Sequence, residues 1–264
     1  MNSEELRNEQ EHSWASVYEI ISSLNKYAAE EVLFYAVQIL GEEMGTKDVA
    51  LYTIANRDYA RLFSATSLEA RKLGNSIRYT ELGALYSELR EGRIYVNTAN
   101  EPDRPALASA VYAEEDLRVI LMFWDVPEEK HALLPAERLT VIVTLLQNTI
   151  LHASRYMSSF RRKNYLEGTN VLNEKTFKVL LKTFFEAKEK GLTECILAEF
   201  EMGYRDYQNI SIQIAYKVRQ TDYMGVMDGG KFYILLANTD LVGARIVQER
   251  FRELGFRCEL KETL

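Results

Sequence analysis

The chain has few of the residues that mark disulfide-stabilised and metal-binding proteins. Its two cysteines, Cys195 and Cys258, fit neither a disulfide framework nor a metal-ligand spacing, so we expect buried thiols in a reducing compartment. Its three histidines, His12, His131 and His152, are widely separated, and none lies beside a nucleophile. The sequence therefore predicts no metal site.

Positive charge and long apolar runs are scarce as well. Lys and Arg number 32 against 39 Asp and Glu, a net charge of −7, which argues against non-specific binding to nucleic acid or an anionic membrane. The uncharged stretch from Leu139 to Ser154 is too short to cross about 30 Å of hydrocarbon. No signal peptide is recognisable, and no Walker-type glycine-rich loop precedes a helix. Only a localised anion site is expected.

Apolar residues make up 47% of the 264 residues, which is enough for two buried cores. We expect an α/β (α+β) chain in three parts. An N-terminal helix over residues 1–45 leads into an antiparallel sheet flanked by helices over residues 46–160. An α/β sandwich follows over residues 161–264.

The first two parts follow from apolar periodicity. One apolar stripe predicts a single helix over residues 3–43. Strands are predicted over 49–54, 61–65, 94–97, 106–112 and 118–124, with a helix from Thr80, its expected cap, to Arg90. A second long helix begins at Pro135 and ends near Phe160. The two long helices either form a homodimer seam or pack on each other and on the sheet.

The third part begins after a basic cluster at residues 161–163. Helices are predicted over 173–190, 207–218 and 241–254, and strands over 194–202, 224–227, 231–236 and 257–261. Asp228-Gly229-Gly230 joins the second and third of these strands as a hairpin, because these residues tolerate positive φ. This order predicts an α/β sandwich.

The segment from Arg219 to Asp240 carries a motif. It reads Arg-Gln-Thr-Asp, five further residues, Asp-Gly-Gly-Lys-Phe and then an apolar strand. It resembles the signature of the diguanylate cyclase (GGDEF) family, in which an inhibitory-site Arg-x-x-Asp stands five residues before a Gly-Gly-Asp-Glu-Phe hairpin. Asn173 and Phe177 resemble the start of the same domain, so the resemblance covers most of the third part.

The departures from that signature concern the residues that an active cyclase needs. The positions of the family's metal-binding and catalytic acids hold Gly230 and Lys231. Phosphoryl transfer needs a divalent metal held by acidic oxygens, whereas glycine offers no ligand and lysine repels the metal. Glu199 and Glu201 lie on the strand where another metal-binding acid sits, either as a partial ligand set or as a same-face pair at a strand edge. We expect no enzymatic activity and no cofactor.

The preceding helix-strand-helix block is similar in layout to a GAF domain. A GAF domain followed by a degenerate GGDEF domain is the cytosolic arrangement of the PelD family, the cyclic-di-GMP receptors of Pel exopolysaccharide secretion, and the chain resembles that family. The resemblance implies a receptor that regulates exopolysaccharide synthesis and export in biofilms through other proteins of a secretion complex. It also implies preceding membrane helices, so the chain is expected at the cytoplasmic face of the bacterial inner membrane or as a soluble relative.

The resemblance implies cyclic-di-GMP as the ligand. The side chains of Arg219 and Asp222 complement its guanine bases. A guanidinium can donate to O6 and N7 of guanine, and a carboxylate can accept from N1–H and N2–H. The two phosphates call for another cation, which the resemblance places on the helix after the hairpin. Arg250 is the best-spaced candidate, and Arg252 and Tyr223 are further candidates.

Three alternatives stay open at the level of sequence. Arg219 and Asp222 could form a surface ion pair at a helix end without a ligand. The chain could be a weak or substrate-altered nucleotidyl cyclase that uses Glu199 and Glu201, or a ligand-free scaffold in which the motif is a relic.

A receptor also needs an element with two states, for which the linker from Phe160 to Leu172 is the candidate.

Overall fold

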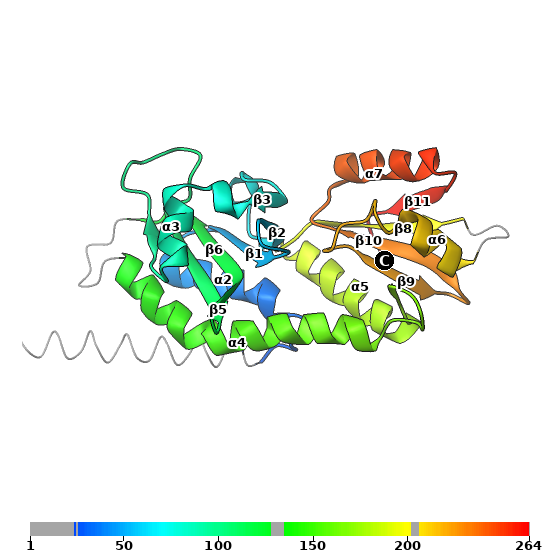
Figure 1. Cartoon of the computed structure of the whole chain (residues 1–264), viewed down its shortest axis with the longest axis horizontal. Coiled ribbons are helices and arrows are strands. Elements are labelled where there is room, and N and C mark those ends of the chain that lie inside the picture. The colour runs from blue at the N-terminus through cyan, green and yellow to red at the C-terminus, as the bar shows by residue number, and fades with distance from the viewer. Residues whose placement is uncertain (1–23, 25, 128–134, 202–205, 264) are drawn as a thin grey trace, which may run out of the picture.

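The structure is a computed structural model that describes residues 24, 26–127, 135–201 and 206–263. Two sheets lie side by side along the long axis, with helices on their faces, and α4 (Pro135–Lys163) runs along both (Figure 1). The mixed α and β class predicted from the sequence is confirmed.

The first sheet has six strands in the order β3-β2-β1-β6-β5-β4, and every pairing is antiparallel. Its strands are β1 (Asp48–Ile54), β2 (Tyr59–Ala65), β3 (Ser76–Arg78), β4 (Tyr95–Val96), β5 (Leu107–Ala113) and β6 (Asp116–Trp124). The five predicted strands are confirmed. The sixth, β3, was missed because three residues are too short to show an alternating pattern.

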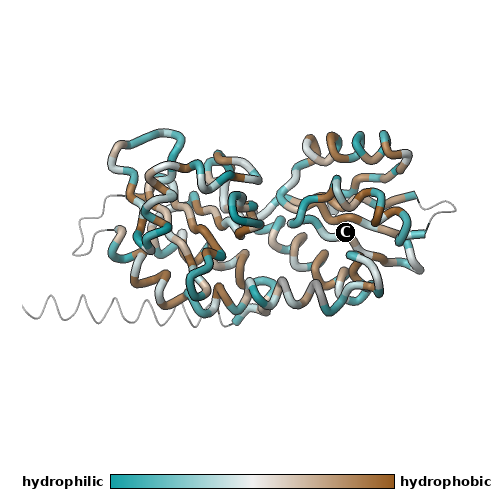
Figure 2. Tube along the Cα trace, in the orientation of Figure 1, coloured by the Kyte–Doolittle hydropathy of each residue, from teal (hydrophilic) through white to brown (hydrophobic). Residues whose placement is uncertain are grey.

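Alternation along these strands builds a core on each face. Leu51 and Leu121 belong to the core shared with α2 (Val32–Met44) and α4, whereas Tyr52 and Ile120 belong to the opposite core with α3 (Ala84–Arg90). Figure 2 shows hydrophobic residues concentrated along the strands of both sheets, with hydrophilic residues in the surrounding loops.

The single helix predicted over residues 3–43 is wrong where the structure describes it, and its first part lies outside the described residues. Turns precede α2, which begins at Val32. The ring of Tyr27 stacks on that of Tyr35, with centroids 3.7 Å apart. In a continuous helix residues eight apart lie about 12 Å apart along the axis, so this contact requires the chain to fold back.

The helix predicted from Thr80 starts later, and Thr80 is not its cap. A 3₁₀ turn over Tyr79–Glu81 precedes α3, and Gly83 is the N-cap with φ of 60°. Glycine adopts a positive φ without a steric penalty, so the chain can leave the 3₁₀ turn at this residue and start α3. Another 3₁₀ turn covers Glu69–Arg71.

The second long helix, α4, begins at Pro135 as predicted and extends three residues beyond Phe160. Its stripe is buried inside the chain, where α4 packs on α2 and β5. Of the two arrangements expected for the long helices, α4 adopts intramolecular packing. The buried members of the stripe are Leu139, Val143, Leu146, Ile150, Ala153 and Met157.

The second sheet has five strands in the order β11-β8-β10-β9-β7, and only β7 and β9 pair in parallel. One face is covered by α5 and the other by α6 and α7 (Figure 1). The elements are β7 (Val171–Leu172), α5 (Glu174–Glu189), β8 (Cys195–Phe200), α6 (Tyr207–Ile214), β9 (Tyr223–Met227), β10 (Lys231–Ala237), α7 (Leu241–Glu253) and β11 (Cys258–Lys261).

Three details of this part can be compared with the sequence. The hairpin between β9 and β10 is confirmed, with positive φ at Asp228, Gly229 and Gly230. The two-residue strand β7 was missed. The helix predicted to reach Val218 ends at Ile214, so Arg219 follows a turn rather than a helix end.

The two sheets share one continuous core. The Phe34 ring lies 4.8 Å from Phe63, within the first sheet's core, and 5.0 Å from Phe184 on α5. The chain is therefore packed across residue 161, and the domain boundary predicted there stays a prediction.

Candidate functional site

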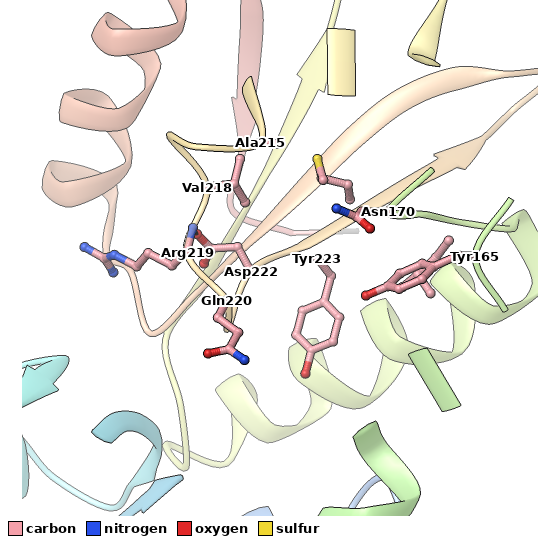
Figure 3. A pocket seen from close by; sticks show the side chains of 10 residues that line it. Tyr165, Asn170, Ala215, Val218, Arg219, Gln220, Asp222 and Tyr223 are labelled. Atoms are coloured by element: carbon pink, nitrogen blue, oxygen red, sulfur yellow. The ribbon is translucent and has the colours of Figure 1, made fainter. Parts of the chain in front are cut away.

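A hollow of about 360 Å³ lies beside the start of β9, a volume in the usual range of roughly 300–1,000 Å³ for small-molecule sites. Three segments form its wall: the loop and strand before α5, the turn after α6, and the first residues of β9 with the turn before them (Figure 3). Its lining residues are Tyr165, Asn170, Leu172, Ala215, Val218, Arg219, Gln220, Asp222, Tyr223 and Met224.

The loop between α4 and α5 is fixed by its own backbone. Leu166 N–H donates to the Val171 carbonyl at 2.7 Å, and Thr169 N–H donates to the Leu166 carbonyl at 3.0 Å. Asn173, which the resemblance picked out, caps α5 by accepting the Thr176 N–H at 2.9 Å. These hydrogen bonds fix the backbone of the loop, from which Tyr165 and Asn170 line the hollow.

Asp222 is held by two backbone donors. Its Oδ2 accepts the N–H of Arg219 at 2.9 Å, and its Oδ1 accepts the N–H of Ala237, at the end of β10, at 3.1 Å. A carboxylate oxygen can accept more than one hydrogen bond, so a backbone bond at each oxygen does not by itself exclude a further donor. The carboxylate position is therefore preorganised by the turn and the neighbouring strand.

Arg219 shares the wall with Asp222, and the surface ion pair at a helix end that stayed open as an alternative is not formed. Both hydrogen bonds between the two residues use the Arg219 backbone: its N–H donates to the carboxylate and its carbonyl accepts from Asp222 N–H. The Arg219 side chain is exposed and extends away from the carboxylate (Figure 3). A long arginine side chain in solvent can turn toward a bound anion or base, at an ordering cost of about 0.5–1.5 kcal/mol.

Tyr223 is a wall residue of a different kind. It is 3% exposed, and its ring makes an edge contact with Phe184, with centroids 5.3 Å apart. A ring so placed connects the wall of the hollow to the shared core. Because it is buried, it does not present a ring face on which a base could stack.

Arg250 and Arg252 are not among the lining residues of the hollow. Both lie in the last turn of α7, where Arg252 pairs with Glu249. Arg250 is nine residues after Leu241, about 13 Å along the axis from the start of the helix. Their roles as ligand residues stay predictions.

The sequence did not single out Tyr165 and Asn170. They enter the wall only because β7 pairs with β9, which brings a loop near residue 165 beside a turn near residue 220. No spacing in the chain signals a parallel pair of two residues.

A second hollow of about 530 Å³ adjoins the first and shares Tyr165, Asn170 and Ala215 with it. Ile212 on α6 belongs to its lining and is 66% exposed. Apolar surface beside a polar hollow suits the face of a heterocyclic base. The two hollows lie next to each other and share part of their wall.

Glu199 on β8 lies beside Lys231 at the start of β10. Lys231 Nζ lies 2.8 Å from Glu199 Oε1, and Lys261 pairs with Oε2. The hydrogen bonds from Lys231 and Lys261 lower the pKa of the Glu199 carboxyl to about 2. Across residues 24–127, 135–201 and 206–263, with residue 25 excepted, no three His, Cys, Asp or Glu side chains gather as a metal site.

The two cysteines are free thiols. Cys195 is fully buried, as predicted, and burial raises its pKa to about 12. Cys258 is only partly buried, and burial raises its pKa to about 11. Both are therefore protonated and poor nucleophiles near neutral pH.

In the described part of the chain, no helix has the length and apolar character that a membrane crossing needs. No protein-family profile matches the sequence, and no curated protein matches it.

Solved structures resemble the chain only distantly. A GAF domain from an Acinetobacter phosphoenolpyruvate-protein phosphotransferase is 14% identical, with a TM-score of 0.43 over 56% of this chain and 96% of that domain. PelD from Pseudomonas aeruginosa is 14% identical, with a TM-score of 0.30 over 95% of this chain and 90% of that one. Another PelD structure from the same organism, in complex with c-di-GMP, is 12% identical, with a TM-score of 0.30 over 94% and 88%. Values this low carry no functional conclusion.

Proposed function

We propose that this chain is a non-catalytic receptor for cyclic-di-GMP and that the dinucleotide binds in the hollow beside Arg219 and Asp222. The observation that carries the proposal is that both residues of the Arg-x-x-Asp motif line one hollow, with the carboxylate fixed by two backbone N–H groups. The Asp222 carboxylate can accept from the donor edge of guanine, and the exposed Arg219 guanidinium, once turned toward the hollow, can donate to its acceptor edge.

The neighbouring hollow supports a ligand larger than one nucleoside. A cyclic dinucleotide has two bases, and the second hollow continues from the first past Tyr165, Asn170 and Ala215. Arg219 lines the first hollow, and neither hollow has another cation among its lining residues. Because its side chain is exposed, it is also the candidate to bind a phosphate.

The absence of catalysis is part of the proposal. Gly230 and Lys231 stand at the hairpin positions where the cyclase signature has acids. Glu199, the remaining acid of that site, is paired with two lysines, Lys231 and Lys261. An ammonium at this place competes with a divalent cation for the same carboxylate.

The biological setting comes from the family resemblance alone. We propose that the chain acts with other proteins of an exopolysaccharide synthesis and export complex at the cytoplasmic face of the bacterial inner membrane. A homodimer through the long helices stays part of that proposal, although the described stripe of α4 packs within the chain.

Calorimetric titration of the purified chain with cyclic-di-GMP tests the receptor. We expect saturable binding by the wild type, loss of at least about tenfold in affinity in Arg219→Ala and Asp222→Ala, and unchanged affinity in Arg90→Ala, an exposed arginine on α3. Arg219→Lys keeps the charge but loses the two-pronged donor, so it also weakens binding. Wild-type protein that takes up no ligand would refute the proposal, and turnover of GTP would refute its non-catalytic part.

A further inference from the structure

Asn238 joins the end of β10 to the first sheet through buried hydrogen bonds. The residue is 5% exposed and has φ of 49°. Its Nδ2 donates to the carbonyls of Leu62 and Phe63 on β2, at 2.9 and 3.0 Å. Both amide hydrogens of the side chain are therefore used by the opposite sheet.

The acceptor groups of Asn238 are used as well. Its Oδ1 accepts from Arg71 Nη1 and Thr193 Oγ1, both at 3.2 Å, and its backbone carbonyl accepts from Asn75 Nδ2 at 2.6 Å. Leu62, Phe63, Arg71 and Asn75 all belong to the first sheet and its loops. One side chain with its own backbone carbonyl thus makes five bonds, and four of them cross between the two sheets.

The residue before Asn238 contacts the candidate ligand site directly. Ala237 N–H donates to Asp222 Oδ1 at 3.1 Å, so the carboxylate of the motif and the contact to the first sheet are fixed by neighbouring residues of one strand end. Tyr223 provides a second route, because its ring packs on Phe184, which packs on Phe63. Both routes reach Phe63, one at its carbonyl and one at its ring.

We propose that Asn238 is a positioning residue that couples the hollow at Arg219 and Asp222 to the docking of the two sheets. The coupling rests on the function proposed above. A ligand that bonds Asp222 favours the state in which Ala237 N–H holds that carboxylate, and this is the state in which Asn238 is docked on β2. Linkage is reciprocal, so docking raises the affinity for the ligand, and the ligand strengthens docking.

Amide hydrogen exchange provides the readout. The Ala65 N–H donates to the Leu192 carbonyl at 3.1 Å, a bond from β2 to the second sheet's unit, so its exchange reports undocking. We expect cyclic-di-GMP to slow exchange at Ala65 in the wild type.

Asn238→Gly is the informative variant, because glycine tolerates the positive φ while the whole side chain, with its amide, is removed. We expect faster Ala65 exchange, a smaller response to ligand, and about 5–150-fold weaker binding of cyclic-di-GMP. Asn100→Gly is the matched control, since Asn100 is exposed on the first sheet's side and has φ of 53°. Asn75→Ala, which removes a single donor to Asn238, repeats the test if the glycine variant does not fold.

The outcomes separate the two proposals. If the wild type binds and both Asn238→Gly and Asn75→Ala match it in affinity and in ligand-induced protection of Ala65, the coupling is wrong and the receptor stands. If the wild type does not bind cyclic-di-GMP, the receptor is wrong and the coupling is wrong with it.

Discussion

Lys231 Nζ lies 2.8 Å from Oε1 of Glu199, so the first residue of β10 forms an ion pair with a residue of the neighbouring strand β8. The Glu199 side chain is 16% exposed and also pairs with Lys261. The two lysines thus pair with both oxygens of the Glu199 carboxylate.

This pairing predicts a displaced titration. We expect the Glu199 carboxyl to titrate near pH 2 by NMR in the wild type and closer to its ordinary value of 4.5 in Lys231→Met, because the largest cause of the shift is removed. The pKa is lower in the folded state, so this contribution to stability is complete above about pH 4.5 and is lost as the pH falls toward 2. Lys175→Met, at an exposed position on α5, should leave the Glu199 titration unchanged.

Gly225 in β9 tests the packing under the motif. A Cβ at this position would lie 2.1 Å from Phe177 Cγ, so Gly225→Ala must displace the ring. We expect a loss of about 1–3 kcal/mol in the free energy of unfolding, measured by urea denaturation. Phe177→Leu combined with Gly225→Ala should lose less than the sum of the single variants. A stable Gly225→Ala protein would contradict the packing of α5 on β9.

Asp222 and Arg219 should differ in their effect on stability. Asp222→Ala leaves the N–H groups of Arg219 and Ala237 without their acceptor, and we expect a loss of about 1–3 kcal/mol. Arg219→Ala removes an exposed side chain and should change unfolding by no more than about 0.5 kcal/mol. Equal losses in the two variants would contradict this account, because they would give the Arg219 guanidinium a structural role.

The two thiols offer a fourth check on the folded state. Burial raises the pKa values of Cys195 and Cys258 to about 12 and about 11, so neither should react rapidly with a disulfide reagent at pH 8. Both should react at once in denaturant. Rapid labelling of native protein at Cys195 would contradict its place in the core.

Much of the fold was predictable because long periodic segments dominate it. The stripe of α4, the alternation in β1 and β6, and the Asp228-Gly229-Gly230 turn all have local causes that can be read from neighbouring residues. The break before α2 was not predictable, because a contact between Tyr27 and Tyr35 overrides an apolar period that continues through the turn.

Only the part of the site that the Arg-x-x-Asp motif provides could be predicted from the sequence. Arg219 and Asp222 stand three apart in sequence and reach the same hollow, but the opposite wall with Tyr165 and Asn170 arrives through the pairing of β7 with β9. The contacts of Asn238 depend on how the two sheets dock, which no local pattern encodes.

A crystal structure of the chain with cyclic-di-GMP tests the central claim most directly. The account predicts a guanine in the hollow, with its N1–H and N2–H donating to the Asp222 carboxylate, the Arg219 guanidinium turned onto its O6 and N7, and the rest of the ligand extending past Tyr165 and Ala215. A ligand bound elsewhere, or a hollow closed by protein side chains in crystals grown with excess ligand, would contradict it.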